Sequence, residues 1–152
     1  MTTSQQSDSK RIAQACYQSQ WQDDAASQHL GLQVLDIDAG YCRLTMQVQN
    51  HMLNGHKTCH GGFIFAMADS CFAYACNSDN RPTVASGCSI DYLRPGFAGD
   101  TLTAVGKRIN RGTRTGLYDV EISNQDGQSV AQFRGRAHQV GEQLLDLSNL
   151  KE

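Results

Sequence analysis

A carboxylate in the middle of an apolar segment is the first feature of this sequence that could do chemistry. Asp69 lies in the run from Phe63 to Cys76, where nearly every other side chain is apolar. Burying a charged carboxylate costs several kcal/mol unless it is paired, and no Lys or Arg lies within a helical turn or two of Asp69. One interpretation is a structural hydrogen bond to a neighbouring hydroxyl or backbone group. The other is a catalytic carboxylate.

Two glycines directly before this run offer backbone N–H groups to a ligand. His60-Gly61-Gly62 stands where a helix would begin, and there the free N–H groups and the positive end of the helix dipole point outward. The glycines either form an oxyanion site or only serve the turn. Asn54, in the loop just before, adds an amide. Together with Asp69 these groups supply a carbonyl polariser, a carboxylate and a group that positions water.

The same loop contains residue types that bind metals, namely His51, His56, Cys59 and His60. Structural zinc sites combine paired Cys or His units from two places in the chain, and only one loop is rich here. We therefore expect no metal site. Cys59 as a nucleophile beside a histidine is an alternative, although no third group that would orient the histidine is evident. We expect His138 to be an ordinary, partly buried histidine.

Basic residues form a further group of candidate ligands; they are Arg94, Lys107, Arg108, Arg111, Arg114, Arg134 and Arg136. Such groups are usually solvated hairpin faces, but they also suit the phosphates of an anionic ligand. The whole chain carries 13 Lys and Arg against 15 Asp and Glu, a net charge of −2. No global field favours nucleic acid, so we expect no nucleic-acid partner, and any anionic ligand must be bound locally.

The sequence pattern predicts the elements that must position these residues. Residues 1–8 are polar and predict disorder, and residues 9–30 predict one amphipathic helix. The long apolar run predicts a buried helix over 60–79, which must be covered all round because it is apolar on nearly all sides. Short alternating runs bounded by turn residues predict strands over 32–37, 41–48, 83–93, 101–109, 115–123 and 129–140. The polar tail, 141–152, has no clear assignment.

This order of elements predicts an α+β domain over residues 9–140, in which a mostly antiparallel sheet wraps around the helix. A chain of 152 residues fits one domain and needs no disulfides for its core. No secretory signal is evident, so we expect the six cysteines to be reduced thiols of a cytoplasmic protein. The mean hydropathy is −0.46, and no apolar stretch approaches about 20 residues. We therefore expect a soluble protein without a membrane partner.

Three segments of the chain resemble the hotdog-fold acyl-CoA thioesterases of the phenylacetate-degradation (PaaI) type; they are Asn54–Gly62, Ala68–Ser78 and Ile90–Asp100. The resemblance spans about residues 30–140 and is much more specific than the His-Gly-Gly motif alone. It implies a central helix wrapped by an antiparallel sheet of about five to six strands. It also implies hydrolysis of aryl-acyl-CoA, such as phenylacetyl-CoA or hydroxyphenylacetyl-CoA, with no metal or redox cofactor. The implied assembly is a homodimer that associates further into a tetramer.

The functional positions of that family fall on Asn54, Gly61 and Asp69, all present here. In this hypothesis the Gly61 amide binds the thioester oxygen, Asp69 attacks or activates water, and Asn54 orients the nucleophile or the acyl group. The residues expected to contact substrate are His60, Gly62, Phe72 and Arg94. Ser70 and Cys71 stand where the family more often has Thr and Ala. Alternative functions are a non-catalytic acyl-CoA-binding module and a hydratase or dehydratase, which would want a catalytic His paired with an acid.

The spacing of two of these residues makes a prediction of its own. Asp69 follows Gly61 by eight residues, which at about 1.5 Å rise per residue separates them by roughly 12 Å along one helix. A general base and an oxyanion donor must each come within about 3 Å of the same reacting group. We therefore expect two chains to share each active site, with the Gly61 end of one helix beside Asp69 of the other.

Overall fold

The structure, a computed structural model, describes residues 3–150. Its longer elements are α1 (Thr3–Trp21), α2 (Ala25–His29), β1 (Gln33–Asp38), β2 (Tyr41–Gln47), α3 (Gly61–Asn77), β3 (Thr83–Tyr92), β4 (Thr101–Arg111), β5 (Thr115–Ser123) and β6 (Ser129–Gln139). Two 3₁₀ turns, Asn50–Met52 and Leu147–Asn149, complete the chain. Within the described residues no helix is both long and apolar enough to cross a membrane.

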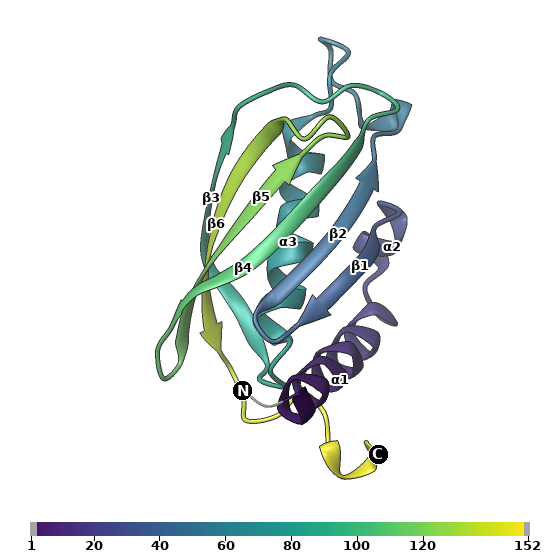
Figure 1. Ribbon diagram of the computed structural model, residues 1–152. Helices are drawn as coiled ribbons and strands as arrows, with labels where there is room; N and C mark the ends of the chain where they lie inside the picture. The colour runs from purple at the N-terminus through teal and green to yellow at the C-terminus, as the bar shows by residue number, and fades with distance from the viewer. Residues whose placement is uncertain (1–2, 151–152) are drawn as a thin grey trace.

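All six strands form one antiparallel sheet in the order β1-β2-β4-β5-β6-β3. Helix α3 lies along one face of this sheet, and α1 packs beside β1 at its edge (Figure 1). The predicted α+β architecture, with a central helix and an antiparallel sheet, is confirmed. The strand at the other edge is β3, which pairs with β6 alone.

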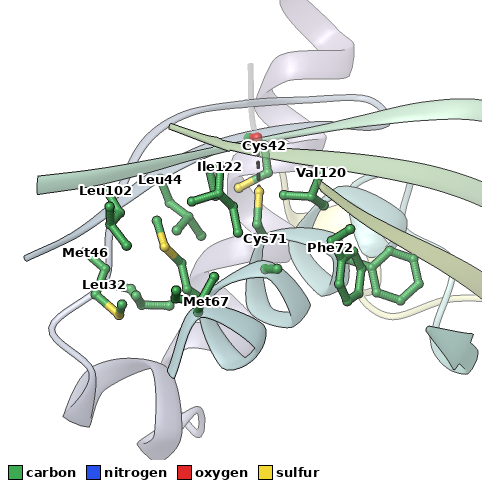
Figure 2. Packing of buried hydrophobic residues seen from close by; sticks show 14 of the residues in the cluster. Leu32, Cys42, Leu44, Met46, Met67, Cys71, Phe72, Leu102, Val120 and Ile122 are labelled. Carbon is green, nitrogen blue, oxygen red and sulfur yellow. Dashed lines mark hydrogen bonds between the residues drawn. The ribbon is translucent and has the colours of Figure 1, made fainter. Parts of the chain in front are cut away.

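The core lies between the sheet and one side of α3. Strand β2 alternates between buried and more exposed positions, so that Cys42, Leu44 and Met46 all point inward. Figure 2 shows these side chains opposite Met67 and Cys71 of the helix. Burial of such side chains stabilises a fold by about 1.5–3 kcal/mol each, which ties α3 firmly to the sheet.

The expectation that the chain covers α3 on all sides is wrong. The sheet covers one side of the helix and α1 and α2 contact another, but a stripe of partly exposed residues remains: Phe65, Ala66, Asp69 and Ala73. These positions recur at helical spacing and therefore share one face. An apolar pattern shows that a helix needs cover, and it does not show which chain supplies that cover.

The N-terminal segment also differs from the prediction. Helix α1 already begins at Thr3, whereas residues 1–8 were expected to be disordered; residues 1–2 lie outside the described range. Lys10 contacts Asp36 of β1 at 2.7 Å and so anchors the helix, and extending an existing helix costs far less than starting one. The predicted single helix over 9–30 is two helices, because Asp24 caps the start of α2 by accepting a hydrogen bond from the Ser27 N–H at 3.0 Å.

Polar contacts fix the C-terminal end of α3. The Asn77 side chain exchanges two hydrogen bonds with the backbone of Thr83, of 2.9 and 3.0 Å. Just beyond the helix, the Asp79 carboxylate accepts hydrogen bonds from both Arg108 and Arg111 of β4. These contacts join the end of the helix to β3 and to β4.

We expect replacement of Asp79 by Ala to destabilise the fold much more than Asp119→Ala. The Asp79 side chain is only 16% exposed, and its loss leaves two largely buried guanidinium groups without a carboxylate, at a cost of about 2–3 kcal/mol. Asp119 is 36% exposed and pairs with the exposed Arg134, so its removal should cost about 0–1 kcal/mol. Urea unfolding measures both losses, and equal losses would contradict this account.

Candidate functional site

At the start of α3, one backbone N–H has no hydrogen-bond acceptor among residues 3–150. The first N–H groups of a helix have no acceptor within it. His60, the residue before the helix, accepts a hydrogen bond from the Gly62 N–H through its Nδ1 atom at 2.9 Å. The Gly61 N–H donates to no acceptor in the described part of the chain. The predicted oxyanion site therefore narrows from two glycines to the Gly61 N–H.

Tyr92, at the end of β3, holds the backbone of Gly61. Its hydroxyl donates a hydrogen bond to the Gly61 carbonyl at 2.9 Å. A Cβ atom at position 61 would lie 2.9 Å from Tyr92 Cζ, closer than real Cβ contacts allow. A larger residue at position 61 would therefore displace this ring. Tyr92 was not among the predicted site residues, because nothing in a strand pattern indicates which helix start its side chain will reach.

Asn54 lies in the same region as Gly61, with its two amide atoms in different roles. The Oδ1 atom accepts hydrogen bonds from the His56 N–H at 2.9 Å and from the Thr58 N–H and hydroxyl at 3.2 Å each. The Nδ2 group has no partner among residues 3–150 and can donate to a ligand. Asn54 thus shapes its own loop and offers a donor.

The structure brings three of the predicted site residues to one hollow. Its lining consists of Asn54, Thr58, Cys59, Gly61, Ile64, Tyr92, Leu93, Arg94 and Pro95. Here a backbone donor, an amide donor and an exposed guanidinium lie around a partly apolar depression. Such an arrangement suits the carbonyl oxygen of an ester or thioester attached to an anionic carrier.

Asp69 lies two helical turns farther along α3, on its partly exposed stripe. Its carboxylate makes no hydrogen bond or ion pair with any described residue. Burial raises the pKa of this carboxyl, and the negative charge of Asp24 raises it further. An unpaired carboxylate with a raised pKa is a stronger base than an ordinary Asp, which makes Asp69 a candidate catalytic group.

Asp24 belongs to a hydrogen-bonded network next to Asp69. It accepts hydrogen bonds from the Tyr74 hydroxyl at 2.6 Å and from the Ser27 hydroxyl at 2.7 Å. The Ser27 hydroxyl also lies 2.8 Å from that of Ser70, the residue after Asp69. Ser70 therefore ties α3 to α2. This network was not predicted from the sequence, because the segment around Asp24 was expected to lie in the middle of one helix.

The expected contact of Phe72 with substrate is corrected by the structure. Phe72 is 1% exposed and packs between Tyr118 and Phe133, with ring centroids 5.6 and 5.8 Å away. The ring lies directly on Gly135, where an added Cβ would come within 2.8 Å of it. Phe72 is therefore a core residue on the sheet side of α3. Its neighbour Cys71 is also buried and donates to the Cys42 carbonyl at 3.3 Å.

The loop before α3 was also considered as a metal site and as the location of a cysteine nucleophile. In residues 3–150 no three His, Cys, Asp or Glu side chains gather as ligands of one metal ion. Burial and the nearby Asp100 raise the pKa of the Cys59 thiol to about 11. Cys59 is therefore a neutral thiol near pH 7 and a poor nucleophile.

Comparison with known proteins agrees with this geometry. The thioesterase superfamily matches residues 56–131. The acyl-coenzyme A thioesterase PaaI of Escherichia coli K12 is 51% identical over 121 residues, which are 80% of this chain and 86% of that protein. The solved structure of the E. coli PaaI protein, from the phenylacetic acid degradation operon, superposes with a TM-score of 0.87 at 47% identity and covers 89% of this chain and 98% of its own.

A more distant solved structure contains a bound ligand. It is a hypothetical thioesterase from Streptococcus pneumoniae in complex with coenzyme A, with a TM-score of 0.77 at 28% identity, and it covers 82% of this chain and 98% of its own. Together with the free Gly61 amide and the unpaired Asp69, these similarities confirm the resemblance drawn from the sequence. The chain belongs to the thioesterase superfamily and is a thioester hydrolase with the hotdog fold.

Proposed function

We propose that this protein hydrolyses aryl-acyl-CoA thioesters, of the phenylacetyl-CoA or hydroxyphenylacetyl-CoA type, to the free acid and CoA. The observation that carries the proposal is the free Gly61 N–H at the hollow shared with Asn54 and Arg94. The similarity to the E. coli PaaI thioesterase supports acyl-CoA as the substrate class. The partly exposed rings of Phe63 and Phe65 on α3 support an aromatic acyl group.

The reaction uses the Gly61 N–H to hold the thioester oxygen as negative charge develops on it. If Asp69 is a nucleophile, its carboxylate attacks the carbonyl carbon, the C–S bond breaks, and water then hydrolyses the resulting anhydride. If Asp69 is a general base, it takes a proton from water, and the hydroxide attacks the carbonyl carbon directly. In both routes the CoA sulfur leaves as thiolate and gains a proton. The Asn54 Nδ2 group orients the nucleophile or the acyl group.

We further infer that two chains build each site. Gly61 and Asp69 stand roughly 12 Å apart along a rigid helix, too far to serve one carbonyl group. A second copy of the chain could pack on two surfaces. They are the partly exposed stripe of α3 and the unpaired edge of β3, where Val84 is exposed. With the α3 helices antiparallel around a two-fold axis, Gly61 of each chain meets Asp69 of the other. Association of two such dimers into a tetramer is part of this proposal.

The basic residues divide into those already engaged and those available for CoA phosphates. Arg108 and Arg111 both bind Asp79, and Arg134 binds Asp119. Arg94 lines the hollow and makes no ion pair with any described residue, so it is our candidate for contact with the CoA portion.

Two alternatives receive less support from the geometry. A hydratase would use a histidine paired with an acid, but the His60 Nδ1 atom is occupied by the Gly62 N–H. A purely ligand-binding module would have no use for an unpaired, half-buried carboxylate such as Asp69, because its desolvation costs stability.

The direct test of this function is a free-thiol release assay over a panel of acyl-CoA substrates. We expect kcat/KM to be higher for phenylacetyl-CoA and its hydroxylated forms than for long-chain acyl-CoA. The reason is that an aryl group can stack on the partly exposed rings of α3. A fatty chain would find few larger apolar side chains in the lining of the hollow, namely Ile64, Leu93 and Pro95. If palmitoyl-CoA proves to be the best substrate, the aryl assignment is wrong.

Replacement of Asp69 by Asn should preserve the fold and lower kcat by about 10²–10⁴-fold, the range for loss of a positioned acid or base. Circular dichroism and thermal unfolding check the fold, and steady-state kinetics measure the loss. The matched control is Asp126→Asn, in the exposed turn between β5 and β6, which should leave kcat unchanged. Near-normal turnover by the Asp69 variant would return this residue to a structural role.

A single turnover in ¹⁸O-labelled water separates the two routes for Asp69. A nucleophilic carboxylate acquires ¹⁸O in its own side chain when the anhydride is hydrolysed at the Asp carbonyl. A general base leaves Asp69 unlabelled and places ¹⁸O only in the product acid. Mass spectrometry of the peptide that contains Asp69 reads out the difference.

A further inference from the structure

We infer that Tyr92 is a positioning residue that aims the Gly61 N–H at the thioester oxygen. The inference rests on the proposed function, which makes this N–H the oxyanion donor. It goes beyond that function, because Tyr92 acts through Gly61 and from another element of the fold, the end of β3.

Two independent contacts join Tyr92 to Gly61. The Tyr92 hydroxyl donates to the Gly61 carbonyl at 2.9 Å, and this bond holds the peptide group that follows the Gly61 Cα atom. The ring also fills the space on the side-chain face of Gly61, where a Cβ would meet Tyr92 Cζ at 2.9 Å and the hydroxyl oxygen at 3.0 Å. The Gly61 N–H belongs to the peptide group that precedes the Cα atom. The hydrogen bond and the ring contact both restrict rotation about the two backbone bonds at this Cα atom, and these rotations set the direction of the N–H relative to the helix.

Gly61 needs such support because glycine has the widest backbone freedom of any residue. The groups on either side are already held: the His60 N–H donates to the Met52 carbonyl at 2.8 Å, and the Gly62 N–H donates to His60 Nδ1 at 2.9 Å. Tyr92 completes this set. An oxyanion donor is effective only when it is already aimed within about 2.7–3.1 Å of the oxygen, so looser support costs rate.

The position of Tyr92 separates this role from a role in the core. Its side chain is 52% exposed, and its backbone pairs with Ala131 of β6 whatever the side chain is. Removal of the hydroxyl alone should therefore change the stability of the fold little. Removal of the hydroxyl should instead lower kcat.

The first test compares Tyr92→Phe with the parent chain. This variant keeps the ring and loses the hydrogen bond, and we expect kcat to fall about tenfold, less than the ~10²–10³-fold that follows removal of a whole oxyanion donor. KM and the Tm should stay close to those of the parent. The matched control is Tyr41→Phe, on β2, which should leave kcat unchanged. An unchanged kcat in Tyr92→Phe, or a kcat loss that only follows a lower Tm, would overturn the inference.

The second test uses the tight contact between the ring and Gly61. We expect Gly61→Ala to lower kcat by about 10²-fold, because the new methyl group displaces the Tyr92 ring and so removes its support of the Gly61 backbone. In a Tyr92→Ala background the same methyl group has space, so the additional loss should be below tenfold. If the fold-loss of kcat in the double variant equals the product of the losses in the two single variants, the two residues are not coupled and the inference is wrong.

A readout without turnover keeps this inference separate from the proposed function. The ¹⁵N order parameter of the Gly61 amide, measured by NMR relaxation, should be lower in Tyr92→Phe than in the parent and in Tyr41→Phe. An unchanged order parameter would overturn the inference even in an active enzyme. A parent chain that releases no thiol from any acyl-CoA would contradict the proposed function, and the order parameters would still decide whether Tyr92 restrains Gly61.

Discussion

The rigidity of α3 is the constraint on which the rest of this structure depends. An α-helix rises about 1.5 Å per residue, so Gly61 and Asp69 are held roughly 12 Å apart whatever the surrounding chain does. The helix is continuous from Gly61 to Asn77, so both residues lie on one regular backbone, and His60 caps its first end while Asn77 and Asp79 anchor the other. The two groups that suit thioester hydrolysis therefore serve different carbonyl groups unless a second chain brings them together.

The partly exposed stripe of α3 is the feature that the proposed shared site would use. A single chain covers α3 with its sheet on one side and with α1 and α2 on another, and it leaves the stripe that contains Asp69 partly exposed. The same chain leaves β3 unpaired along one edge (Figure 1). In an isolated molecule, an exposed apolar stripe and an unpaired strand edge both favour non-specific association. A second copy that covers them would remove this exposure.

The sequence predicted the elements of this fold better than the environment of individual side chains. Strand alternation located β4 to β6, because one buried face imposes a period of two. An almost wholly apolar helix carries no such information about its faces, and for this reason Phe72 was placed with the substrate rather than in the core. Tyr92 and Asp24 reach α3 from distant segments, and contacts of that kind leave no periodic signal. Gly61 and Asp69 were proposed as site residues because a glycine and a carboxylate stand out at the start and in the middle of an apolar run, and Asn54 was proposed because its amide lies in the loop just before that run.

Mixed dimers of two inactive variants test the shared site most directly. Asn54→Ala chains and Asp69→Ala chains are combined under conditions of subunit exchange, and mass spectrometry verifies that hybrids form. If Gly61 and Asn54 of one chain act with Asp69 of the other, each hybrid has one site with both lesions and one site with neither. An equal mixture should then recover about a quarter of the parent activity, since half of the dimers are hybrids with one intact site of two. Activity that stays at the level of the separate variants despite complete exchange would show that Asn54 and Asp69 act within one chain.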